Sequence, residues 1–338
     1  MLDTLAGIAR EAGERIMKLY ERRDYSTYQK PDESPVTSAD MAASELIIDR
    51  LQQVYPDIPV LSEESEHESY QQRRGWQRYF LIDPIDGTQE FISRSGDFAV
   101  NIALVEDNQP TLGVIFWPAG NSLYAAKRGE GAYKTTTAGS QQIRVRALDD
   151  PQSDPIIIAI SRRQPRAPVL SRIQTDRELQ PLPAGSCSLK ACFIAEGKAD
   201  CFLRLGPTGE WDTAAAQVIV SEAGGTIVNV TSILSRHPKA SAPVYCATKA
   251  GLATFTDALR LQLAPLGIHV AEAIPPMVAT EMTAGRGGGA KLSPEAMAKA
   301  IVEGVARGSK RIAPGFSRPF LMIDRIAPEI AAAMLAKS

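Results

Sequence analysis

An early segment of the chain carries apolar side chains at the spacing of an α-helix. Over residues 3–22 these side chains recur every three or four positions, which puts them on one helix face. A second helix is expected to begin near Ser38 or Asp40, which are capping residue types, and to end near Val54. Two helices are therefore expected in this part of the chain.

Shorter apolar runs follow, and turn residues separate them. These runs predict strands over residues 59–61, 79–82, 98–105, 111–117 and 122–126. The polar, proline-containing stretch 135–155 is interpreted as a boundary between subdomains. After it, strands alternate with helices as in an α/β layer, with strands over 156–160, 200–204 and 226–230 and helices over 188–196 and 212–223.

Beyond about residue 226 the pattern changes again. A helix over 243–264 precedes a strand over 268–274, which Pro275-Pro276 ends. The stretch 284–290 is rich in glycine and is expected to be a loop, whereas Ser293-Pro294 is typical of a helix start. The tail from residue 320 is expected to be helical.

Composition and charge exclude several classes of protein. The 338 residues are 44% hydrophobic and 22% charged, as in globular proteins, and the net charge of −2 argues against a basic binder of nucleic acid polymers. The longest apolar run, residues 156–160, is too short to span a membrane, and we expect no signal peptide. Four cysteines without Cys-x-x-Cys spacing are typical of reduced thiols, so the predicted location is cytoplasmic, with peripheral attachment to the inner membrane left open.

Three groups of acidic residues are candidates for chemistry. Glu63 and Glu64 follow the strand 59–61, the run Asp83-Pro84-Ile85-Asp86-Gly87-Thr88 follows the strand 79–82, and Asp212 stands at a predicted helix start. Carboxylates gathered at strand ends repel one another and need a counter-charge. A divalent cation that prefers oxygen ligands supplies it.

The middle group is the most informative of the three. Pro84 restricts the turn between Asp83 and Asp86, so both carboxylates can face one site together with the carbonyl of Ile85. Gly87 permits close approach of the backbone, and Thr88 opens a helix whose free N–H groups favour a phosphate. Because paired metal ions can activate a water and stabilise a leaving oxygen, the pattern indicates hydrolysis of a phosphate ester.

Each group also has a simpler interpretation. Asp83 and Asp86 alone suit a solvated turn, Asp212 alone suits a helix N-cap, and Glu63-Glu64 alone suits a charged surface pair. Their joint occurrence weakens these interpretations and favours a metal-assisted phosphatase.

Residues 1 to about 229 resemble the inositol monophosphatase superfamily. The resemblance rests on the segments Ser34–Asp40, Leu61–Glu64, Asp83–Thr88, Trp211–Ala216 and Glu222–Gly225. It implies an α+β or α/β layered fold of the sugar-phosphatase type, with layers in the order αβαβα. A metal-binding α+β subdomain is expected over residues 1–135, and an α/β subdomain over residues 136–229.

Within this superfamily, further segments are similar to the 3′(2′),5′-bisphosphate nucleotidases: Trp76–Phe80, Gln89–Ile92, Val100–Leu104 and Ser188–Lys190. The similarity implies a Mg²⁺-dependent phosphomonoester hydrolase with two or three ions. Its small-molecule partner would be a phosphorylated nucleotide, adenosine 3′,5′-bisphosphate, from which it removes the 3′-phosphate. Inositol monophosphate and fructose 1,6-bisphosphate stay open as substrates, because nothing in the spacing of the residues separates them.

The resemblance also implies roles for individual residues. The metal ligands would be Glu63, Asp83, the Ile85 carbonyl, Asp86 and Asp212, and the residues that activate water would be Asp40, Glu63 and Thr88. Substrate contacts would come from Glu63, Ile85, Asp86, Gly87, Thr88, Ser188, Lys190 and Asp212. For Ser188 and Lys190, a helix start with an exposed lysine is an equally good interpretation.

Residues from about 226 to 338 resemble another family, the C-terminal half of a short-chain dehydrogenase/reductase. Ser232 lies 13 residues before Tyr245, and Tyr245 and Lys249 share a helix face at positions i and i+4. Residues 1–225 contain no glycine-rich turn for a dinucleotide, so these three residues are interpreted as vestigial. An NAD(P)-dependent oxidoreductase is therefore disfavoured, and the resemblance implies a C-terminal α/β appendage like half of a Rossmann domain.

The chain thus resembles a chimera joined at a strand that both families share, with the dehydrogenase-like part over residues 230–338. We expect the strand 268–274 to replace the missing last strand of the phosphatase sheet. A non-catalytic fusion is the remaining alternative. The apolar faces of the C-terminal part are expected to favour a homo-oligomer.

Overall fold

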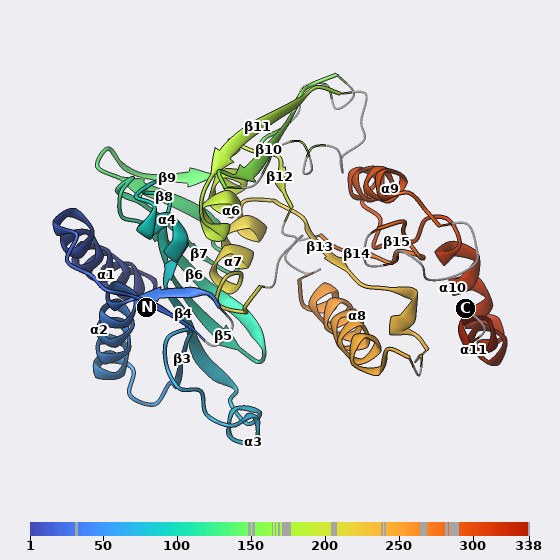
Figure 1. Ribbon diagram of the computed structural model, residues 1–338, viewed down its shortest axis with the longest axis horizontal. Helices are drawn as coiled ribbons and strands as arrows, with labels where there is room; N and C mark the ends of the chain where they lie inside the picture. The colour runs from blue at the N-terminus through green and yellow to red at the C-terminus, as the bar shows by residue number, and fades with distance from the viewer. Residues whose placement is uncertain are drawn as a thin grey trace. The chain divides into compact units, whose positions relative to one another are not determined.

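The computed structural model describes residues 1–338 except 31–32, 148–149, 151–152, 164, 166, 168–169, 171–176, 204–207, 238, 240, 264–268, 281–282, 284–290 and 337–338. The chain forms two compact units (Figure 1). The N-terminal unit comprises residues 1–166 and 177–225, and the C-terminal unit comprises residues 167–176 and 226–338. The expected glycine-rich loop 284–290 lies outside the described residues.

The N-terminal unit is built on a seven-stranded sheet in the order β3-β4-β5-β6-β7-β8-β9. Its strands pair antiparallel except for the parallel pair β3–β4. The strands are β3 (Val60–Ser62), β4 (Arg78–Asp86), β5 (Ala99–Glu106), β6 (Gln109–Trp117), β7 (Ser122–Lys127), β8 (Ala132–Thr136) and β9 (Gly139–Ile143). The first five were predicted; β8 and β9 were not, because pairing with neighbours holds polar residues in strands without any apolar signal.

Two helices cover one face of this sheet, α1 (Leu2–Arg22) and α2 (Ser38–Val54). Their buried side chains pack with Phe80 and Ile82 of β4 and with Val100 and Ile102 of β5. These are alternate residues, so each strand presents one apolar set to α1 and α2 and the other set to the opposite face. A two-stranded ribbon, β1 (Thr27–Gln29) with β2 (Pro35–Thr37), connects the two helices.

Helices α6 (Cys187–Ala195) and α7 (Ala214–Glu222) cover the opposite face, where they pack against Leu81, Ala103 and Ile115. A three-stranded parallel sheet in the order β11-β10-β12 packs on α6, with Ala159 and Ala184 against Phe193. Its strands are β10 (Ile156–Ser161), β11 (Leu179–Ala184) and β12 (Cys201–Phe202). The described residues therefore follow the expected αβαβα order through its first four layers.

The C-terminal unit contains a parallel sheet in the order β13-β14-β15. Its strands are β13 (Ile227–Val230), β14 (Val270–Ala273) and β15 (Arg311–Ile312), and its helices are α8 (Pro243–Leu263), α9 (Pro294–Ala306), α10 (Ser317–Ile326) and α11 (Pro328–Ala336). Helix α8 connects β13 to β14, and α9 lies between β14 and β15. Helix α9 starts as predicted, because the hydroxyl of Ser293 accepts a hydrogen bond from the Ala296 N–H.

The prediction that the strand 268–274 completes the phosphatase sheet is wrong. Its described part is β14, which pairs with β13 along one edge and with β15 along the other. A strand has only two edges, and both edges of β14 are paired. β14 therefore does not pair with the sheet of the N-terminal unit.

Three further features complete the fold. Helices α3 (Tyr70–Arg73) and α4 (Thr88–Ile92) are short, and α4 directly follows β4. The four cysteines are free thiols. Among the helices whose residues the structure describes, none has the length and apolar character needed to cross a membrane.

Candidate active site

A break in strand β4 places two predicted carboxylates on one face of the sheet. Asp83 pairs with Asn101 and Asp86 pairs with Ala99, so three steps along β4 correspond to two along β5. Without the extra residue, Asp83 and Asp86 would point to opposite faces, because side chains alternate along a strand. Pro84 lies inside the break, where its missing N–H costs no ladder hydrogen bond.

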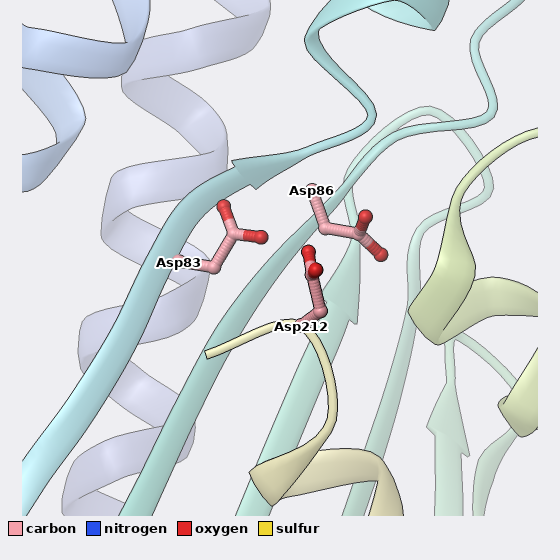
Figure 2. Close-up of side chains that lie close together, drawn as sticks. All are labelled: Asp83, Asp86 and Asp212. Carbon is pink, nitrogen blue, oxygen red and sulfur yellow. The ribbon is translucent and has the colours of Figure 1, made fainter. Parts of the chain in front are cut away.

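Asp83, Asp86 and Asp212 form an acidic cluster. Each offers one carboxylate oxygen, and these oxygens lie within 4.8 Å of one another (Figure 2). Asp212 reaches the cluster from the turn before α7, where the N–H of Gly209 donates to its Oδ2 at 2.8 Å. Carboxylates at this spacing repel one another, and their oxygen donors suit a hard divalent cation.

Asp83 is the most buried member of the acidic cluster. It is 1% exposed, and neither of its carboxylate oxygens has a hydrogen-bond partner among the described residues. Burial raises the pKa of Asp83 well above its ordinary value, and the negative charges of Glu63, Asp86 and Asp212 raise it further. Burying such a group is unfavourable without a partner, so its geometry fits a metal ligand.

The start of helix α6 holds Asp86. Its carboxylate accepts hydrogen bonds from the N–H groups of Cys187 at 3.4 Å and Ser188 at 2.6 Å, and from the Ser188 hydroxyl. Ser188 is fully buried, and its two hydrogen bonds orient Asp86. Lys190 is not the exposed lysine of the simpler interpretation, since it is 5% exposed and donates to the Gly185 carbonyl at 2.7 Å.

Glu63 lies beside the acidic cluster and is not one of its three members. The ammonium group of Lys30 donates to Glu63 at 2.8 Å and to Glu64 at 2.7 Å. Burial raises the pKa of Glu63, and Lys30 opposes that change. Lys30 supplies a counter-charge that could not be predicted from the sequence, because a contact between positions 33 residues apart leaves no local signal.

The structure brings Asp40 and Thr88 into contact. The Thr88 hydroxyl donates to Asp40 Oδ1 at 3.0 Å and lies 3.3 Å from the Ile85 carbonyl oxygen. The other carboxylate oxygen of Asp40 accepts from the N–H and hydroxyl of Thr37, which is the N-cap of α2 in place of Ser38 or Asp40. Asp40 is 1% exposed, and burial raises its pKa.

Gly87 follows the acidic run in a conformation that other residues rarely adopt. Its φ is +97°, and a Cβ there would lie 3.1 Å from the Cβ of Ser186 and 3.2 Å from the carbonyl oxygen of Asp97. Glycine is therefore required both by the backbone angle and by the close approach of the next segment.

Asn101 is a second polar residue for which no role was predicted, although it lies in the segment Val100–Leu104 that resembles the nucleotidases. It is 1% exposed, and neither its amide oxygen nor its amide nitrogen has a partner among the described residues. The available signal is an amide inside the apolar run Ala99–Val105.

The three dehydrogenase-like residues lie in the C-terminal unit. Lys249 donates to the Val230 carbonyl at 2.9 Å, and its ammonium nitrogen lies 5.7 Å from the ring centre of Tyr245. The buried Ser232 caps a 3₁₀ turn by accepting from the Leu234 N–H at 3.2 Å. All of these contacts join residues of the C-terminal unit itself.

The layers of the N-terminal unit and the carboxylates at the break in β4 fit a metal-dependent phosphatase. The sequence pattern of the inositol monophosphatase family matches residues 1–261, and the chain belongs to this family. This match extends beyond residue 229, where the sequence resemblance was expected to end.

Known relatives agree with this assignment. The 3′(2′),5′-bisphosphate nucleotidase CysQ of Escherichia coli K12 is 42% identical over 228 residues, which cover 67% of this chain and 89% of that protein. The structure of CysQ from Bacteroides thetaiotaomicron is 37% identical, with a TM-score of 0.55, and the match covers 66% of this chain and 86% of that one. The extragenic suppressor protein suhB from Bartonella henselae has the same TM-score of 0.55 at 26% identity, over 66% of this chain and 84% of that chain.

Proposed function

We propose that this protein is a Mg²⁺-dependent phosphomonoester hydrolase that removes the 3′-phosphate of adenosine 3′,5′-bisphosphate. The buried carboxylate of Asp83 carries the proposal, because its oxygens have no partner among the described residues and it lies beside Asp86 and Asp212. Relatives named 3′(2′),5′-bisphosphate nucleotidase at 42–43% identity support this substrate.

The residues of the site fit Mg²⁺. Asp83, Asp86 and Asp212 would hold it, with the Ile85 carbonyl as a further oxygen donor and Glu63 as another once its pairing with Lys30 is exchanged. Two or three ions are proposed, in keeping with the number of oxygen donors. When bound, the metal lowers the pKa of a water molecule and neutralises charge on the leaving oxygen.

Thr88 and Asp40 are proposed to orient the water and to take up its proton. The Thr88 hydroxyl donates its hydrogen bond to Asp40, so the lone pairs of the Thr88 oxygen can accept a hydrogen bond from the water. Thr37 fixes the other side of Asp40 and keeps this geometry. Glu63, at the edge of the site, would assist in activating this water.

The phosphate is proposed to bind to the N–H groups of Gly87 and Thr88. Ser188 and Lys190 would approach the nucleotide only after local rearrangement, because Ser188 is hydrogen-bonded to Asp86 and Lys190 is hydrogen-bonded to the Gly185 carbonyl. Their proposed effect on the substrate is therefore indirect: Ser188 orients Asp86, and Lys190 supports the loop before α6.

The first test measures inorganic phosphate released from adenosine 3′,5′-bisphosphate by the full chain. We expect release in Mg²⁺, its loss in EDTA and its return when Mg²⁺ is restored. The kcat/KM should exceed those for inositol monophosphate and fructose 1,6-bisphosphate by at least about tenfold, since polar groups built for one substrate discriminate against others. Equal values for all three would contradict the nucleotide assignment, and no release by a folded chain would favour the non-catalytic fusion.

For the organisation of the chain we propose a metal-binding subdomain over 1–135, an α/β subdomain over 136–229 and a dehydrogenase-like part over 230–338. The parallel strands β13, β14 and β15, with a helix between each pair along the chain, support the last part. Ser232, Tyr245 and Lys249 are proposed to be vestigial, since their contacts are local to the unit.

Self-association is proposed for the C-terminal unit. It exposes large apolar side chains, among them Leu261 at 78% and Ile326 at 84%. Size-exclusion chromatography with light scattering is expected to give a mass of two chains or more, because burying such side chains is favourable. Leu261→Glu or Ile326→Glu should shift the mass toward one chain, whereas Thr248→Glu on an exposed polar position should not. A wild-type mass of one chain at all concentrations would contradict the proposal.

A further inference from the structure

Asn101 and Asp83 form a buried polar pair on the sheet. The register of β4 and β5 places them directly opposite each other. Residues so paired project to the same face, with Cβ atoms about 4.5–5.5 Å apart. Both are 1% exposed, and all four of their side-chain polar atoms are without a hydrogen-bond partner among the described residues.

Apart from Asp83, the strand neighbours of Asn101 on this face are apolar. Ala99 and Ala103 flank it along β5, and Ile115 lies opposite it on β6. All three belong to the apolar cluster that α6 and α7 cover. Because a buried amide is unfavourable without a polar partner, Asp83 is the neighbour that explains an asparagine at this position.

We propose that Asn101 is a positioning residue of the metal site, whose amide nitrogen would donate, after rotation of a side chain, to an Asp83 oxygen that the cation leaves free. A carboxylate that binds metal through one oxygen keeps lone pairs on the other, and a donor there fixes its orientation. The inference rests on the proposed metal-dependent function and extends it beyond the ligands.

The chemistry of the donor explains why the residue is an amide. A lysine at position 101 would compete with the cation for Asp83, as Lys30 is paired with Glu63 at the edge of the site. An acid would add another negative charge to a group of carboxylates that already repel one another. Asparagine donates a hydrogen and brings no net charge.

The test compares Asn101→Ala with Asn101→Ser, which are nearly equal in size but differ by a hydroxyl donor. Binding of Mn²⁺ to the full chain is measured by isothermal titration calorimetry. Asn101→Ala is expected to weaken Mn²⁺ binding about 10–100-fold, as found for residues that orient metal ligands, and Asn101→Ser to recover part of it. The two variants should have equal thermal midpoints without metal and an unchanged KM for adenosine 3′,5′-bisphosphate at saturating Mg²⁺.

Gln109→Ala is the matched control. Gln109 is 3% exposed, its amide oxygen has no partner among the described residues, and it lies at the hairpin between β5 and β6. Its loss should leave Mn²⁺ affinity unchanged. Wild-type affinity in both Asn101 variants would overturn the positioning role, and failure of the wild-type chain to bind Mn²⁺ would overturn the proposed function and this inference with it.

Discussion

Replacing Asp83 by asparagine is expected to lower Mg²⁺-dependent phosphate release about a thousandfold or more while the chain stays folded. A bound metal supplies several kcal/mol of transition-state stabilisation, and each ~1.4 kcal/mol is tenfold in rate. The carboxylate of Asp83 is the buried member of the acidic cluster without a hydrogen-bond partner among the described residues. Its replacement by an amide therefore removes a proposed metal ligand. Phosphate release from adenosine 3′,5′-bisphosphate measures the effect.

Thermal unfolding separates this loss of ligand from a loss of structure. Without metal, Asp83→Asn should unfold at the same or a higher temperature than the wild type, because it removes one of several repelling buried charges. Saturating Mg²⁺ should raise the wild-type midpoint by about 5–10 °C and leave that of the variant unchanged. Asp49→Asn, the same change on an exposed residue of α2, should behave as the wild type. Wild-type activity in Asp83→Asn would exclude Asp83 as a ligand.

Replacing Gly113 by alanine is expected to produce a large loss of stability from a single methyl group. A Cβ at Gly113 of β6 would lie 2.4 Å from the carbonyl oxygen of Ala215, which belongs to the backbone of α7. The helix must move, and overpacking of this kind costs about 2–3 kcal/mol, or about 5–10 °C in the midpoint of a unit this size. Because Asp212 lies in the turn before α7, the shift in midpoint on adding Mg²⁺ should shrink as well.

Gly7→Ala is the matched control for this substitution. Gly7 lies in helix α1, and a Cβ there would have no atom within 4 Å. The same methyl group should therefore stabilise the chain by about 0.5–1 kcal/mol, since alanine favours a helix over glycine. If the two substitutions shifted the calorimetric midpoint in the same direction, that result would contradict the close approach of α7 to β6.

Elements with a strong local signal could be predicted from the chain alone. Helix α1 and the strands β3 to β7 follow from the pattern of apolar residues, whereas α2 follows from its capping residue types and α9 from Ser293 and Pro294. The strands β8 and β9 could not be predicted, because polar residues become strands there through pairing with neighbours. The sheet that β14 joins also could not be predicted, because local sequence does not show which strands will pair with it.

The candidate site divides in the same way. Asp83, Asp86 and Gly87 were recognisable because they lie within five positions of one another, where a proline break and a glycine turn act locally. The structure adds contacts between distant positions: Ser188 on Asp86 across 102 residues, and Lys30 on Glu63 across 33. Asn101 comes opposite Asp83 only through the register of two strands.

By itself, the sequence determined which oxygen donors are available to a cation or to water, since carboxylates and a threonine hydroxyl offer these oxygens at any position in the chain. Only the tertiary structure decided which carboxylates meet, which are neutralised by Lys30 and which stay buried without a partner. These outcomes depend on burial and on pairing between segments far apart in the chain, and both arise only when the sheet and its helices are packed together.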